Sequence, residues 1–121
     1  MNNGIYFLND ISGLKSDDKL YTAASEINKL EIADFVLSNE TVQGATTGKL
    51  LKEGLEYTYI QSTKRFKLYT EDYNLIYIKS GNGFIKWSRG ERNFKEGDLI
   101  HFFVVKEYEL NGICSFIVFK K

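Results

Sequence analysis

The chain has 121 residues, 43% of them hydrophobic and 15% aromatic, and its 16 basic side chains balance its 16 acidic ones. This composition excludes a disordered chain, and the length predicts a single domain over residues 1–121. Zero net charge argues against a nucleic-acid partner, because such proteins usually carry a strongly basic face. No run of about 18 apolar residues is present, so we also expect no membrane partner.

Residues 1–43 are predicted to form an N-terminal arm that holds one short helix. Ser16-Asp17-Asp18 offers caps and favourable charge for a helix N-terminus. Apolar side chains then recur at helical spacing between residues 21 and 30, at Ala23, Ala24, Ile27 and Leu30. Residues 31–38 are predicted to form a strand. No basic region followed by a long apolar run opens the chain, which predicts a cytoplasmic protein without a signal peptide.

Residues 44–121 are predicted to form a β-rich body of short strands. These strands span 55–62, 66–70, 73–79, 84–87, 92–94, 99–105 and 113–119. Turn signals separate them at Gly81-Asn82-Gly83, Glu96-Gly97-Asp98 and Asn111-Gly112. Many short strands at roughly even spacing indicate an all-β barrel or sandwich. The single cysteine, Cys114, lies in the last apolar run and is predicted to be a buried, inert thiol.

Two stretches of the body carry a family resemblance. Residues 75–83 form a hydrophobic strand that ends in a G-x-G sequence, and residues 94–100 contain a G-D turn that enters the next strand. Their order and spacing resemble the centre of a cupin domain. The resemblance implies an all-β, cupin-like double-stranded β-helix (jelly-roll) barrel over residues 44–121, with the short helix in the preceding arm.

The resemblance does not extend to the metal ligands with which cupins usually hold a transition metal. The family's first two histidines fall on Leu68 and Thr70, or on Lys67 and Tyr69, its glutamate on Asn74 and its last histidine on Tyr108. Imidazole and carboxylate groups are what such metals need, and His101 is the single histidine of the chain. We therefore expect neither a bound metal nor another cofactor.

The same register predicts where a ligand would bind. Counted from Gly97, Tyr108 is expected to point into the barrel mouth, where the family places a histidine. The candidate ligand-binding residues are Tyr69, Asn74, Tyr77, His101 and Tyr108, with the tyrosines as an aromatic wall and the other two as polar partners. The alternatives stay open that the rings merely fill the barrel and that His101 is a hydrogen-bonded structural residue. A register slip of one residue would turn every side chain to the other face.

Three functions fit these observations. The first is a metal-free domain that binds a small polar or sugar-like ligand. The second, implied by the resemblance, is a metal-independent enzyme similar to sugar-phosphate isomerases or sugar-nucleotide epimerases, with His101 as general base and Tyr108 opposite it. The third is a structural or regulatory interaction domain. Apolar edge strands that need covering also predict a homodimer.

Overall fold

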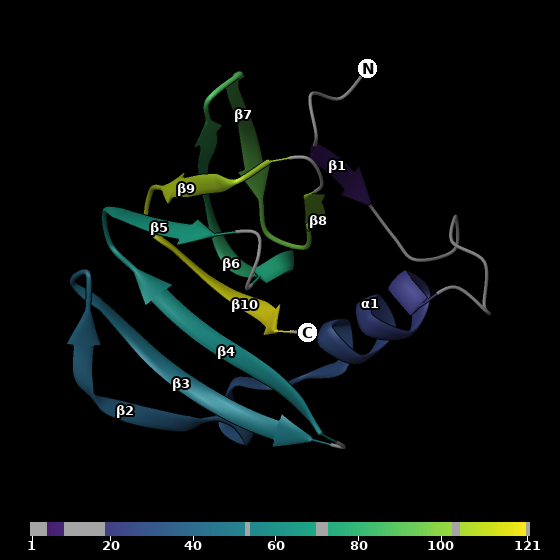
Figure 1. Ribbon diagram of the computed structural model, residues 1–121. Coiled ribbons are helices and arrows are strands. Elements are labelled where there is room, and N and C mark those ends of the chain that lie inside the picture. Colours follow the sequence, from purple (N-terminus) through teal and green to yellow (C-terminus); the bar gives the residue numbers. More distant parts are fainter. Residues whose placement is uncertain (1–4, 9–18, 53, 70–72, 103–104, 121) are drawn as a thin grey trace.

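The computed structural model (Figure 1) describes the chain except for residues 1–4, 9–18, 53, 70–72, 103–104 and 121. For Tyr69 and Asn74, among other residues within strands, it describes the backbone but not the side chain. The elements are β1 (Ile5–Leu8), α1 (Lys19–Lys29), a 3-10 helix (Ile32–Asp34), β2 (Val36–Val42), β3 (Ala45–Lys52), β4 (Leu55–Ser62), β5 (Arg65–Tyr69), β6 (Tyr73–Trp87), β7 (Gly90–Lys95), β8 (Leu99–Phe102), β9 (Glu107–Asn111) and β10 (Cys114–Lys120).

Strand β6 is long enough to belong to two antiparallel sheets. Its first half pairs with β8 and β10, and its second half pairs with β7 and β9. The larger sheet has the order β1-β8-β6-β10-β4-β3-β2, and the smaller one the order β5-β9-β6-β7. Figure 1 shows these strands curling around a common interior. The predicted all-β jelly-roll barrel with one short N-terminal helix is confirmed.

Apolar side chains cover both faces of the larger sheet, because successive residues of a strand point to opposite faces. On β10, Phe116 and Val118 face the barrel interior while Ile117 and Phe119 face outward. The interior cluster also contains Ile5, Ile60, Phe66, Leu68, Ile76, Ile78, Ile85, Trp87, Phe94, Ile100, Phe102, Tyr108 and Leu110. The outer cluster contains Tyr57, Tyr59, Leu75 and Leu99, together with Ala24, Ile27 and Leu30 from α1 and the turn after it.

Helix α1 is fixed at its C-terminal end by a lysine of β6. Lys79 Nζ donates a hydrogen bond of 2.6 Å to the carbonyl oxygen of Leu30, just beyond the last helical residue. A cation is favourable there because the carbonyls at a helix C-terminus lack partners within the helix. Among the described residues, no helix is long and apolar enough to cross a membrane.

The predicted turn at Gly81-Asn82-Gly83 is wrong, because these residues lie within β6 where it passes from one sheet to the other. A Cβ atom on Gly81 would lie 2.2 Å from the carbonyl oxygen of Ile113, and one on Gly83 would lie 1.9 Å from that of Asn111. The turn between β9 and β10 therefore packs directly on the bare backbone of β6. Here the glycines mark a close approach of two backbones and not a chain reversal.

The first 43 residues also differ from the prediction. Residues 31–38 were expected to form one strand, but they contain the 3-10 helix and the start of β2. Strands β1 and β2 both join the larger sheet, through β8 and β3. The predicted helix cap at residues 16–18 lies outside the described residues, as do residues 103–104 at the end of the predicted strand 99–105.

A glutamine side chain joins the two sheets on one side of the barrel. In the turn between β2 and β3, Gln43 Oε1 accepts a hydrogen bond of 2.9 Å from the Lys67 N–H, and its Nε2 donates one of 3.2 Å to the Lys67 carbonyl oxygen. The amide thus replaces the missing neighbour of β5, whose described pairing is with β9. This contact covers an otherwise open strand edge.

Candidate functional site

Two of the residues predicted to bind a ligand lie on the outer face of the larger sheet. Tyr77 packs against the outer cluster beneath α1, and Lys79 Nζ lies 5.5 Å from its ring centroid. His101 is half-buried and pairs directly with Leu75, which belongs to the same outer cluster. Directly opposed residues of neighbouring strands share a face. Tyr77 and His101 therefore point to the helix side of the sheet.

Tyr108 lies on the other face, in the barrel interior. Its side chain is 2% exposed, and its ring stacks on Phe102 with the centroids 3.7 Å apart. Its partners across the smaller sheet, Leu68 and Trp87, are also buried. The structure therefore does not join Tyr108 with Tyr77 or His101 in one wall, because the parity of the strands sets them on opposite faces.

For the remaining two predicted residues, Tyr69 and Asn74, the structure describes only the position of the backbone. Tyr69 ends β5 and pairs with Glu107, one position from Tyr108 along β9. Asn74 is the second residue of β6, next to Leu75. The side chains of both lie outside what the structure describes, so their part in a ligand site stays a prediction.

The positions of the family's metal ligands do not suit a metal. Leu68 and Tyr108 both lie in the apolar interior cluster. Within the part of the chain that the structure describes, no group of three or more His, Cys, Asp or Glu residues could hold a metal ion. Carbon side chains and a stacked phenol supply none of the nitrogen or carboxylate ligands that such ions require.

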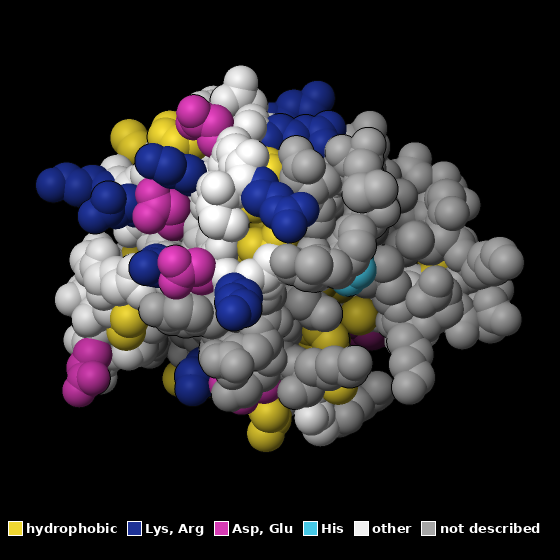
Figure 2. Space-filling view, turned by 45° about the horizontal axis from the view of Figure 1, so that its top comes forward, with side chains coloured by type: hydrophobic (Ala, Val, Ile, Leu, Met, Phe, Trp, Pro, Cys, Tyr) yellow, Lys and Arg dark blue, Asp and Glu magenta, His cyan; other side chains and the backbone are white. Residues whose placement is uncertain are grey.

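A first depression, which we call the charged depression, lies on the smaller sheet and has a volume of about 330 Å³. Its lining residues are Arg65, Lys67, Lys86, Trp87, Ser88, Glu107, Tyr108 and Glu109. Lys67 Nζ lies 3.3 Å from Glu107 Oε2, and Glu109 pairs with Lys67 on one side and Lys86 on the other. Opposite charges placed in this way compensate one another across the strands. Figure 2 likewise shows basic and acidic side chains interspersed on the face that it views.

A second depression, which we call the edge pocket, lies between the two sheets and has a volume of about 300 Å³. Its lining residues are Phe7 from β1, Arg92, Asn93, Phe94 and Lys95 from β7, and Asp98 from the turn before β8. In the described residues, β1 pairs with β8 and β7 pairs with β6, so each is an edge strand of its sheet. The pocket thus occupies a seam where no strand joins the two sheets.

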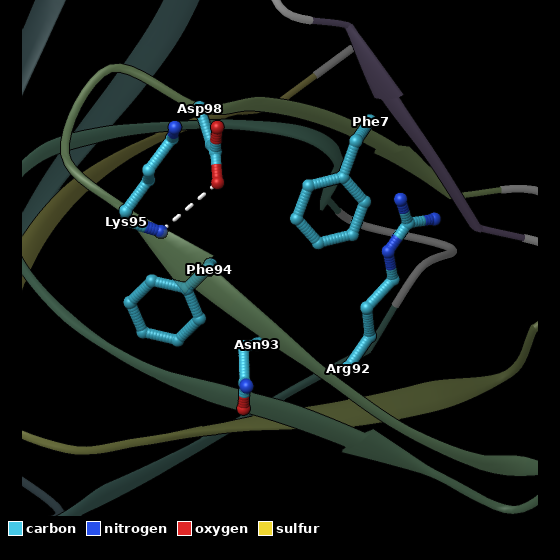
Figure 3. A pocket seen from close by; sticks show the side chains of 6 residues that line it. All are labelled: Phe7, Arg92, Asn93, Phe94, Lys95 and Asp98. Carbon is cyan, nitrogen blue, oxygen red and sulfur yellow. Dashed lines mark hydrogen bonds between the residues drawn. The ribbon is translucent and has the colours of Figure 1, made fainter.

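The turn from β7 to β8 fixes the carboxylate of the edge pocket. Asp98 is 6% exposed, and its Oδ2 accepts a hydrogen bond of 2.9 Å from the Lys95 N–H, drawn in Figure 3. The Asp98 N–H in turn donates to the Lys95 carbonyl oxygen at 3.1 Å, and Gly97 between them adopts a φ of 90°. These bonds close a tight turn, which holds the carboxylate at the wall of the pocket.

An arginine and an aromatic ring face each other across the seam. The guanidinium carbon of Arg92 lies 4.1 Å from the ring centroid of Phe7. Figure 3 shows this pair on one side of the pocket and Lys95 with Asp98 on the other. With two cations and one carboxylate, the lining has a formal excess of one positive charge. The arrangement can therefore hold a polar ligand between apolar rings and charged groups.

The edge pocket could not be predicted from the sequence, because Phe7 and residues 92–98 lie far apart along the chain. Residues 5–8 alternate too briefly to be recognised as a strand, and nothing in the sequence shows that they pair with β8. The G-D turn was predicted, but the resemblance to cupins placed the predicted ligand site at the barrel mouth. A signal was present in the two cations of residues 92–95, which share one strand with the buried Phe94.

Comparisons with known proteins bear on the fold. No family profile matches the sequence, and no curated protein is significantly similar to it. Among solved structures, mannose 6-phosphate isomerase from Bacillus subtilis superposes with a TM-score of 0.58 and 19% identity over 71% of this chain. This chain spans 28% of the isomerase.

Two smaller proteins superpose over most of their length. A protein of unknown function from Vibrio parahaemolyticus has a TM-score of 0.58 and 9% identity, covering 70% of this chain and 96% of that one. A cupin 2 conserved barrel domain protein from Salinispora arenicola has a TM-score of 0.50 and 13% identity, covering 76% of this chain and 85% of that one. The fold is cupin-like. The predicted resemblance to cupins is thus confirmed at the level of the fold.

Proposed function

We propose that this domain binds a small polar, sugar-like ligand in the edge pocket. The observation that carries the proposal is the buried carboxylate of Asp98 in a pocket that also presents the rings of Phe7 and Phe94. The part of the half-buried Phe7 ring that stays exposed can contact the C–H groups of a sugar, while a carboxylate accepts hydrogen bonds from its hydroxyl groups. The volume of about 300 Å³ suits a ligand of about the size of one monosaccharide.

The hydrogen bonding of Asp98 supports a role beyond that of closing the turn. Burying a carboxylate is costly unless its oxygens find donors. The bond from the Lys95 N–H uses one lone pair of one oxygen, whereas a carboxylate has about four acceptor sites. Ligand hydroxyl groups would supply further donors at the wall of the pocket.

The enzymatic alternative receives no such support. It requires His101 and Tyr108 to act on one ligand, but His101 points to the outer face of the larger sheet while Tyr108, on β9 of the smaller sheet, points into the barrel interior. The similarity to mannose 6-phosphate isomerase concerns the fold, yet it makes sugar phosphates a sensible first set of probes.

Isothermal titration calorimetry with a panel of monosaccharides, polyols and their phosphates tests the proposal. We expect at least one member to bind and Asp98→Asn to weaken that binding about tenfold, because the neutral amide is a poorer acceptor for hydroxyl groups. Asp34→Asn is the control, since Asp34 is exposed and is not among the residues that line the pocket. Failure of every compound to bind, or an Asp98→Asn protein that binds as the wild type does, would contradict the proposal.

A further inference from the structure

We propose that the ligand of the edge pocket carries an anionic group, such as a phosphate or a carboxylate, and that Arg92 binds this group from a position fixed by Phe7. The inference rests on the proposed function and names the chemical class of its ligand. It makes Arg92 a binding residue and Phe7 a positioning residue that acts through Arg92.

The charges of the pocket are the first support. Arg92 and Lys95 lie on the same strand, and neither forms an ion pair with a carboxylate among the described residues. Asp98 bonds to the backbone of Lys95, and no ion pair links it to either cation. By contrast, Lys67 in the charged depression has Glu107 at 3.3 Å. The edge pocket therefore presents two cationic groups that form no ion pair among the described residues, and Asp98 leaves the lining a formal excess of one positive charge.

The position of the guanidinium group is the second support. A guanidinium has five N–H donors, all in its plane, and it can stack on an aromatic ring through its flat face. The distance of 4.1 Å between Arg92 Cζ and the ring centroid of Phe7 corresponds to such a contact. Because stacking uses the face and not the edge, the donors remain directed sideways. A planar pair of oxygens from a phosphate or a carboxylate can then be bound in a bidentate manner.

The origin of Phe7 is the third support. Strand β1 brings Phe7 to the pocket by pairing with β8, and its neighbour Ile5 is fully buried in the interior cluster. Phe7 is half-buried and packs against that cluster. A long, flexible arginine side chain loses entropy when it is fixed by a ligand, and a ring that already holds it reduces this cost. Phe7 should therefore affect the binding of the anionic group more than the binding of a neutral sugar.

The test compares inorganic phosphate, glucose and glucose 6-phosphate by isothermal titration calorimetry at low salt. Glucose 6-phosphate is expected to bind about tenfold or more tightly than glucose, because charge-assisted hydrogen bonds are the strong ones. Arg92→Ala should abolish this difference and the binding of inorganic phosphate. Arg89→Ala is the control, since Arg89 is exposed in the neighbouring turn and does not line the pocket, and it should leave all three affinities unchanged.

Variants of Phe7 test the positioning role separately. Phe7→Leu should lower the affinity for phosphate and glucose 6-phosphate several-fold and leave glucose binding almost unchanged. Phe7→Tyr keeps the ring and should restore wild-type affinity. Equal binding of glucose and glucose 6-phosphate by the wild type, or an unaltered preference in Arg92→Ala, would overturn the inference and leave the proposed function standing. If neither these probes nor the wider sugar panel bind, the proposed function fails as well.

Discussion

At the scale of single residues, Gly81 and Gly83 of β6 determine how closely the turn between β9 and β10 approaches this strand. Gly83 has no positive φ angle, so it is needed for space and not for backbone conformation. Gly44, in contrast, has a φ of 82°, and a Cβ atom added to it would meet no atom within 4 Å. Comparing Gly83 with Gly44 therefore separates the need for space from the need for a positive φ angle.

We expect Gly83→Ala to lower the free energy of unfolding by about 3 kcal/mol or more, because the added methyl group would meet the backbone of Asn111, which cannot move aside as a side chain can. Gly44→Ala should cost about 1 kcal/mol through its φ angle alone. Urea unfolding of both variants measures the difference. Equal losses would show that β6 and the β9–β10 turn are not packed as closely as described.

Cys114 is buried as predicted, and its burial has a consequence for stability at high pH. The side chain is 3% exposed, and desolvation raises the pKa of its thiol from 9.0 to about 11. Burial favours the neutral form, so above pH 9 the unfolded chain ionises at this position before the folded chain does. The stability that Cys114 contributes is therefore complete below pH 9 and is lost as the pH rises to about 11.

Replacing Cys114 by alanine tests this pH dependence. The free energy of unfolding of the wild type should fall relative to Cys114→Ala by about 2 kcal/mol between about pH 8 and about pH 11, since a tenfold change in an ionisation constant corresponds to about 1.4 kcal/mol and the folded thiol itself begins to ionise near the upper pH. Every other ionisable side chain is common to both proteins, so the difference between them isolates Cys114. Chemical denaturation at the two pH values provides the measurement. A difference that does not change with pH would contradict the burial of the thiol.

Residues also show where sequence reasoning stops. The resemblance to cupins predicted the barrel fold, but it did not predict the face to which each side chain points. Tyr77 and Tyr108 were expected in one wall, although Tyr77 alternates with Ile76 and Ile78, which fill the interior. The alternation of side chains along a strand can be read from the sequence. Which of the two alternating sets faces the interior cannot be read, because apolar residues cover both faces of this sheet.

At the scale of elements, α1 and the short strand β5 were predicted, whereas β1 and the eight-residue β3 were covered by no predicted strand. The spacing of Ala24 and Ile27 identified α1, and the G-D turn identified the entry to β8. Strand β1 has four residues, and its pairing with β8 spans most of the chain. Such a contact arises from the tertiary fold and leaves no local pattern. The edge pocket depends on this strand, which is why the pocket could not be found from the sequence.

Strand β2 is the element at which we expect the predicted homodimer to form. All seven of its residues are exposed, and Val36 is 79% exposed. β2 is the last strand of the larger sheet, so its outer edge offers unpaired backbone groups to a second copy. Light scattering should give a mass above 14.0 kDa at high concentration, and Val36→Lys should shift it toward that monomer mass.

Ile113→Lys serves as the control for that experiment. Ile113 is 75% exposed, which is close to the exposure of Val36, but it lies in the turn between β9 and β10. The Ile113→Lys variant should therefore have the same mass in light scattering as the wild type. A wild-type protein that stays monomeric at every concentration, or equal effects of the two lysines, would contradict a dimer formed through β2.

At the scale of the whole molecule, the cupin-like barrel has two sides on which its sheets meet. On one side the Gln43 amide bonds to the backbone of β5 and joins the sheets. On the other side β1 and β7 leave a seam, which is lined by Phe7, Arg92, Lys95 and Asp98. The interior between these sides is filled by apolar residues, including the Tyr108 ring. This filled interior is why we propose a ligand site in the seam and not in the barrel mouth.

The most direct test of this account is an amide chemical-shift titration of the labelled protein with glucose 6-phosphate. We predict that the largest shift changes cluster at the edge pocket, on the amides of Phe7, Arg92, Lys95 and Asp98. The amides of Trp87 and Tyr108, in the charged depression, should change little. Changes centred on Trp87 and Tyr108, or none at concentrations that saturate the calorimetric signal, would contradict a ligand site in the edge pocket.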